Sequence, residues 1–313
     1  NAVTATSLRQ VAGTGTTTLN GALDVNGSVP TTATGVVLAN NQITTTATSS
    51  IATAGGDVFL AGDDMSLGGA AGSINAGGGN VTLTTQAAGR PITLGAAGGL
   101  SLTTGELNTL ANAPGVNIGT DAAFLSTPAH TATITVDAAT SPTPAGLTAL
   151  NITNAGTTAV DSVIFNATLT SPKPVTASTL SGNIKFTPSG QIVANGVAAA
   201  DRVVNLTAST GQIDGNATNV ASYLAGSPFV NVQADRLNAT AQSGLGVPNA
   251  LVTQVNDIQT TTTAVDANIN IYNVGALNLA GSGVDAGTTS AGGNVTLVAT
   301  GAITQTAPVK GDA

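Results

Sequence analysis

Apolar residues recur along this chain in pairs spaced two residues apart, and glycine-rich stretches separate the pairs. The pattern is clearest in residues 51–118, where Val58 pairs with Leu60 and Val81 pairs with Leu83. A spacing of two is the period of a strand that buries one face. The pattern therefore predicts many short strands that end at glycine corners.

One stretch occurs twice and carries this pattern most plainly. Residues 74–83 read INAGGGNVTL, and residues 292–297 read GGNVTL. Three short strands with their corners make a coil of roughly 20–30 residues, within the size range of solenoid repeats. We therefore expect an all-β fold, a parallel β-solenoid whose coils stack on one another.

The regularity of the pattern suggests three parts: 1–120 as solenoid coils, 121–190 as a less regular β segment, and 191–313 as further coils. The middle part contains two proline pairs, at 142 and 144 and at 172 and 174, and proline cannot sit inside a ladder. We expect these to be loops, within a lateral insertion or a small separate sandwich.

Two short segments have helix-like apolar spacing instead. Leu107 and Leu110 are three residues apart, which predicts a turn or a single helical turn before Pro114. Val252 and Ile258 flank Val255 with the same spacing, but the threonine run that follows disfavours a continuing helix.

Composition narrows the class of protein. Charged residues are 7% of the chain, the formal net charge is −8, aromatic residues are 2%, and cysteine is absent. Without cysteine there is no disulfide and no thiolate metal site. The seven basic residues are scattered, which argues against nucleic acid as a partner. The chain contains no run of about 18 apolar residues, which is the length that would predict a transmembrane helix.

Several stretches together resemble a known class of bacterial protein. Residues 239–246 read ATAQSGLG, residues 269–279 read INIYNVGALNL, and residues 15–21 read GTTTLNG. With the two GGNVTL units, these resemble the giant repetitive exported proteins of the filamentous-haemagglutinin and autotransporter-adhesin type, over about two-thirds of the chain. The resemblance implies a right-handed parallel β-helix and an extracellular, bacterial cell-surface location.

Residues that could catalyse a reaction are sparse. Asp63 and Asp64 are the only adjacent acidic pair, and neighbours on a strand point to opposite faces. Glu106 is the sole glutamate and His130 the sole histidine. No serine lies in a nucleophile elbow. We expect that the protein is not an enzyme.

A second internal repeat carries charge. Residues 200–208 read ADRVVNLTA, and residues 234–241 read ADRLNATA. Stacking would bring Asp201 and Arg202 close to Asp235 and Arg236. We interpret these four residues as a ladder of surface charges rather than a catalytic cluster.

Calcium is the one metal that the residues suggest. Residues 281–285 read GSGVD, which resembles half of a calcium-roll motif and makes Asp285 a candidate ligand. Asp63 and Asp64, which follow Gly62, could also offer carboxylate oxygens. No other cofactor is expected.

Asparagine followed by Ser or Thr two residues later is frequent, and we interpret it as stacked asparagines at coil corners rather than as glycosylation acceptors. The positions are Asn26, Asn80, Asn151, Asn166, Asn205, Asn216, Asn238 and Asn294.

These features predict a structural role, as a surface fibre, a filament subunit or an adhesin segment. Residues 11–23 and 295–306 are ordinary strand sequence rather than caps. We therefore expect that strand edges are covered by further copies of the chain, or by more of the same polypeptide, and that host or matrix glycans are possible partners. The alternatives are a carbohydrate-binding or carbohydrate-cleaving β-helix, and an S-layer-like lattice protein.

Overall fold

The computed structural model describes residues 2–25, 34–120, 130–156, 161–217, 229–287 and 293–311. Almost all regular structure in this part of the chain is β-strand. The chain divides into two compact units, Asn1–Thr153 (unit 1) and Asn154–Ala313 (unit 2). Among the described residues, no helix is long and apolar enough to cross a membrane.

Unit 1 consists of short parallel strands and one helical turn. They are β1 (Val3–Ala5), β2 (Leu8–Gln10), β3 (Thr16–Leu19), β4 (Ala22–Val25), β5 (Thr34–Thr45), β6 (Ser50–Thr53), β7 (Asp57–Leu67), β8 (Ile74–Asn75), β9 (Val81–Thr84), β10 (Ile92–Leu94), β11 (Leu100–Leu102), α1 (Thr104–Leu107), β12 (Leu110–Ala111), β13 (Gly115–Gly119), β14 (Ile134–Val136) and β15 (Ala149–Asn154).

These strands form three parallel ladders in unit 1. Ladder 1 has the order β1-β4-β6-β8-β12, ladder 2 the order β2-β5-β7-β9-β13-β15, and ladder 3 the order β11-β10-β14. In ladder 2, equivalent positions stack into a row of buried side chains. The row is Val36, Val58, Val81, Val116 and Leu150. The period-two pattern of the sequence thus becomes one continuous apolar interior.

Glycine corners connect the ladders where the predicted strands end. Gly77, between β8 and β9, has φ +59°, and an added Cβ would meet the carbonyl oxygen of Thr53 in the layer below. Only glycine combines this left-handed conformation with so close a backbone approach.

The helix-like spacing near Leu107 corresponds to a single helical turn, as expected. Thr103 caps α1 in a capping box, in which its hydroxyl accepts from the Glu106 backbone and the Glu106 side chain accepts from the Thr103 N–H. Glu106 Oε1 also accepts from the Leu67 N–H at 3.2 Å, so the turn is fastened to β7.

Unit 2 repeats one pattern of strands. They are β16 (Asp161–Phe165), β17 (Thr168–Ser171), β18 (Val175–Thr179), β19 (Asn183–Phe186), β20 (Gln191–Ala194), η1 (Ala199–Asp201, a 3-10 turn), β21 (Val203–Ala208), β22 (Gln212–Asp214), β23 (Val232–Gln233), β24 (Arg236–Ala241), β25 (Gly244–Leu245), β26 (Leu251–Gln254), β27 (Asp257–Thr262), β28 (Ile269–Asn273), β29 (Leu277–Ala286), β30 (Val295–Ala299), β31 (Ile303–Gln305) and β32 (Val309–Lys310).

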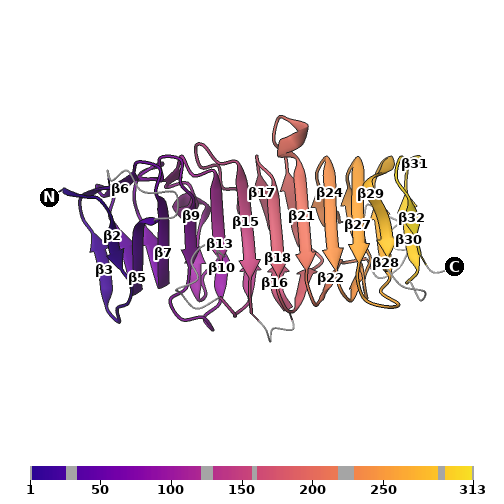
Figure 1. Ribbon diagram of the computed structural model, residues 1–313, viewed down its shortest axis with the longest axis horizontal. Helices are drawn as coiled ribbons and strands as arrows, with labels where there is room; N and C mark the ends of the chain where they lie inside the picture. Colours follow the sequence, from indigo (N-terminus) through magenta and orange to yellow (C-terminus); the bar gives the residue numbers. More distant parts are fainter. Residues whose placement is uncertain are drawn as a thin grey trace. The chain divides into compact units, whose positions relative to one another are not determined.

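Successive strands of unit 2 visit three parallel ladders in turn. Ladder 4 is β16-β19-β22-β25-β28, ladder 5 is β17-β20-β23-β26-β28, and ladder 6 is β18-β21-β24-β27-β29-β31. Figure 1 shows β21, β24 and β27 of ladder 6 side by side as parallel arrows. The buried row of ladder 6 is Val175, Val204, Leu237, Ile258 and Leu279.

Buried asparagines hold the corners of unit 2. Asn273 is fully buried, and its Oδ1 accepts from the Val255 N–H and from Thr253 Oγ1. Its Nδ2 donates to the carbonyls of Val255 and Ala276. These bonds satisfy backbone groups that the corner would otherwise leave unpaired.

Outward-facing asparagines also stack: Asn238 Nδ2 donates to Asn205 Oδ1 at 2.8 Å. Of the positions expected to stack, Asn26 lies outside the described residues.

In the looser middle segment, 121–190, the described strands join parallel ladders. In unit 2, β16, β17 and β18 begin the three ladders, and Pro172 and Pro174 lie between β17 and β18. Residues 121–129 and 157–160 lie outside the described part. The division at 120 and 190 stays a prediction.

Candidate functional site

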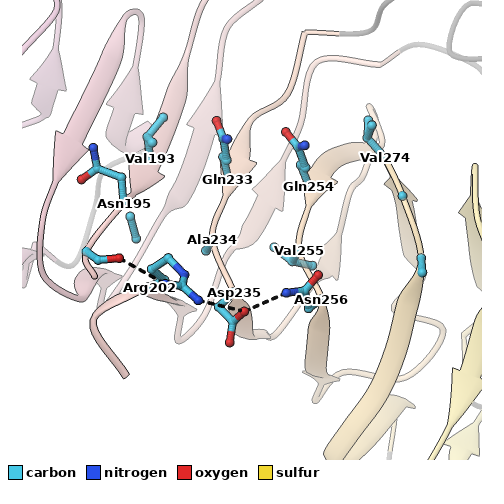
Figure 2. Close-up of a pocket in the computed structure, with 14 residues that line it drawn as sticks. Val193, Asn195, Arg202, Gln233, Ala234, Asp235, Gln254, Val255, Asn256 and Val274 are labelled. Atoms are coloured by element: carbon cyan, nitrogen blue, oxygen red, sulfur yellow. Dashed lines mark hydrogen bonds and ion pairs between the residues drawn. The ribbon is translucent and has the colours of Figure 1, made fainter. Parts of the chain in front are cut away.

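A groove of about 540 Å³ lies on unit 2, where strands of ladder 5 end and the chain turns toward ladder 6. β20, β23, β26 and the residues that follow β28 contribute one side of it, and the segment around Arg202 and Asp235 contributes the other (Figure 2).

The upper row of the groove is set by strand register. Val193 pairs with Gln233, and Gln233 pairs with Gln254. Val274, the residue after β28, continues this row in Figure 2. Gln233 and Gln254 are both exposed and project side by side. Neither glutamine side chain makes a hydrogen bond within the described part of the chain.

The lower row of the groove is polar and charged. Arg202 Nη2 lies 3.6 Å from Asp235 Oδ1, and Asn256 Nδ2 donates to the same oxygen at 2.7 Å. Arg202 also donates to the carbonyls of Gly196 and Val197. Its charge is therefore compensated and its donors are largely used within the protein.

This lower row belongs to a longer series of ion pairs in unit 2. Lys173 pairs with Asp201 at 3.0 Å, and Arg236 pairs with Asp257 at 3.3 Å. Together with Arg202 and Asp235, these pairs confirm the predicted ladder of surface charges. The two repeats that read Ala-Asp-Arg (the ADR repeats, residues 200–202 and 234–236) lie at the starts of neighbouring strands, because β21 pairs directly with β24. The Asp and Arg side chains of both repeats take part in these three ion pairs, so their arrangement is that of a surface network.

The calcium candidates of unit 1 lie on β7. Asp63 Oδ1 accepts from the Ala87 N–H at 2.8 Å, and Asp64 Oδ2 accepts from Gln42 Nε2 at 3.1 Å. Asp63 also lines a hollow of about 430 Å³ with Asn41 and Gln86. Asp64 is exposed and does not line this hollow.

The third calcium candidate, Asp285, lies on β29 in unit 2 and therefore belongs to a different unit from Asp63 and Asp64. Its Oδ2 lies 3.2 Å from Lys310 Nζ, while its buried Oδ1 has no hydrogen-bond partner among the described residues. The described residues contain no group of three His, Asp or Glu side chains that could hold a metal ion. Calcium binding stays a prediction.

The sole histidine is buried in unit 1. His130 Nδ1 lies 3.1 Å from Thr85 Oγ1, and the Thr85 hydroxyl donates to the Ala87 carbonyl. Burial lowers the pKa of His130 to about 4, against a weaker favourable interaction with the backbone of Ala132. At neutral pH the ring is uncharged and packed inside the unit.

Arg202 and Asp235 of the groove were singled out from the sequence, but the two glutamines were not. Gln233 precedes one ADR repeat, but Gln254 precedes no such repeat, and only the register of β23 with β26 brings the two together. The usable signal is the position of both glutamines at strand ends.

Comparisons of the chain with known protein families, with curated proteins and with solved structures give no match.

Proposed function

We propose that this chain is a right-handed parallel β-solenoid that serves as a structural segment of an extracellular bacterial surface fibre, filament or adhesin. The parallel ladders and the return of successive strands to the same ladders support the solenoid. Sequence resemblance to large repetitive surface proteins supports the location. The role rests on association through strand edges rather than on catalysis.

The observation that carries the proposal is an uncovered layer in unit 2. Ile303 of β31 pairs with Leu277 of β29, and Leu277 is buried whereas Ile303 is 46% exposed. Val309 of β32 pairs with the buried Val284 and is 42% exposed. These two apolar side chains form what we call the end patch. They occupy positions that a further layer would bury.

The first strands of unit 1 show the same feature. Val3 of β1 pairs with Leu23 of β4. Leu23 is buried, but Val3 is 53% exposed. Apolar positions that are covered within a ladder are thus uncovered at its outermost described strand.

A further strand, from more of the same polypeptide or from a second copy of the chain, would cover this edge. An outermost parallel strand offers unpaired N–H and C=O groups, and a strand from another copy would satisfy them while burying the end patch. The low charge density of the chain favours association between copies, because only 7% of residues are charged and repulsion between copies is weak.

The test is assembly of the whole chain as a function of concentration. We expect sedimentation velocity to show association and electron microscopy to show ordered filaments. Ile303→Lys with Val309→Lys places charges on the end patch and should shift association to at least about tenfold higher concentration. Val265→Lys is the matched control, because Val265 is 57% exposed at a corner rather than on an outermost strand.

Single molecules at every concentration would overturn the association, as would equal effects of the double variant and of Val265→Lys. Filaments that dissolve on chelation of calcium would instead favour an S-layer-like lattice and the calcium prediction.

A further inference from the structure

We propose that the groove of unit 2 binds a neutral oligosaccharide in extended form, with Gln233 and Gln254 as its principal polar contacts. This site is separate from the end patch and does not depend on assembly. The two glutamines are exposed, adjacent in register and directed side by side (Figure 2).

Other stacked amides in this protein satisfy one another. Asn151 Nδ2 donates to Asn117 Oδ1 at 2.9 Å, and Asn238 Nδ2 donates to Asn205 Oδ1 at 2.8 Å. In contrast, Gln233 and Gln254 have no side-chain hydrogen bond in the described part of the chain. Their amides keep both donors and both acceptor lone pairs available for a ligand.

A sugar is a ligand that suits two amide side chains without partners in the protein. Each primary amide donates and accepts at once, as do the adjacent hydroxyl groups of a sugar ring. Paired strands repeat the amides at about 4.8 Å along the groove, so the contacts recur along an extended chain of sugars. Exposed Asn195 lies on the same groove and adds a third amide with no side-chain partner in the described residues.

The charges of the groove favour a neutral ligand over an anionic one. Arg202 is the only basic residue among those that line it. It pairs with Asp235 and donates to the carbonyls of Gly196 and Val197. An anionic ligand would have to compete with these internal partners, whereas a neutral one uses the glutamines without breaking them.

The strand pairing at the groove disfavours a peptide strand as its ligand. Ala194 and Val255 also line the groove, but they are 2% and 3% exposed and offer a ligand little apolar surface. β23 already pairs with β20 on one side and with β26 on the other. It therefore has no open edge to which a peptide strand could add. No aromatic residue lines the groove, so we expect millimolar affinity for a single site.

The experiment titrates the whole chain with neutral oligosaccharides of glucose, mannose and galactose, followed by NMR of the glutamine side-chain amides. We expect saturable binding with the largest shifts at Gln233 and Gln254. The double variant Gln233→Ala, Gln254→Ala should weaken binding by about tenfold or more. Gln242→Ala is the control, because Gln242 is exposed at the end of β24 and does not line the groove.

Several results would overturn the assignment. Absence of binding to every neutral oligosaccharide at tens of millimolar would do so, as would equal weakening by Gln242→Ala. Binding only to acidic oligosaccharides or to peptides would show that the ligand class is wrong. The variant with charges on the end patch should bind sugar normally, so failure here is distinguishable from failure of the association.

Discussion

Acidification should destabilise unit 1 through its buried histidine. His130 is 1% exposed, and burial lowers its pKa from 6.5 to about 4. Nδ1 faces Thr85 Oγ1, and Nε2 has no hydrogen-bond partner among the described residues. A proton on Nε2 would therefore have no acceptor there, and burial outweighs the favourable interaction of the charged ring with the backbone of Ala132.

The sign and size of the effect follow from the two pKa values. Below pH 6.5 the unfolded chain binds a proton at His130 that the folded chain binds only near pH 4. Stability from the neutral ring is therefore fully present above pH 6.5 and is lost as the pH falls toward 4. We expect a loss of about 2 kcal/mol at pH 5 and about 3 kcal/mol at pH 4.

The assay compares the wild type with His130→Gln, which has no titrating ring. Urea unfolding followed by far-UV circular dichroism gives the free energy of unfolding of each protein at pH 7, 6, 5 and 4. Carboxylate titration affects both proteins, so the difference between them isolates His130. A difference that does not change between pH 7 and pH 5 would refute the assignment of a buried, neutral ring.

Three further substitutions test the fold. Asn273→Ala removes a fully buried amide with four hydrogen-bond partners and should lower the free energy of urea unfolding by about 3 kcal/mol. Its control is Asn294→Ala, which changes an exposed residue and should lower that free energy by under about 0.5 kcal/mol. Glu106→Ala removes half of the capping box of α1 and should cost about 1 kcal/mol, measured in the same way. Gly99→Ala should lower the midpoint of thermal unfolding, because Gly99 has φ +60° and an added Cβ would meet the Pro91 carbonyl; Gly89→Ala, which has open space, should not.

Much of the strand pattern was predictable because the period of two survives into the ladders. Val58, Leu60, Val81 and Leu83 were expected to be inward-facing strand residues, and all four are buried on paired strands. The glycine corner at Gly77 was also expected, since a positive φ is required there. Local chemistry determines these features, so the local sequence carries them.

Helix-like spacing misleads where a strand ends at a corner. Val252, Val255 and Ile258 are three residues apart, but Val252 lies on β26, Val255 lies at the corner, and Ile258 lies on β27. All three are buried. A corner residue that points inward mimics the next position of a helix, and only the ladders on both sides distinguish the two.

The groove was not predictable because register depends on the length of the connections. Gln233 meets Val193 on one side and Gln254 on the other. The number of residues between neighbours in this row is unequal, because the connections vary in length. No fixed period in the sequence aligns the three. The ion pairs were easier to foresee, because the ADR repeat places Asp and Arg together in both copies.

In a protein built of parallel ladders, residue type alone is a poor guide to function. The neighbours of a polar side chain in its row determine whether it is hydrogen-bonded within the fold. Asn238 bonds to Asn205, and Asp235 bonds to Arg202, so these polar residues are satisfied within the fold. Gln233 follows Val193 in its row and precedes Gln254, and the valine side chain cannot bond to the glutamines. A polar pair that its row leaves unsatisfied must bond to water or to a ligand, and a groove that holds the ligand in place makes the second outcome favourable. We therefore expect a ligand to bind in the groove rather than at the more conspicuous acidic residues.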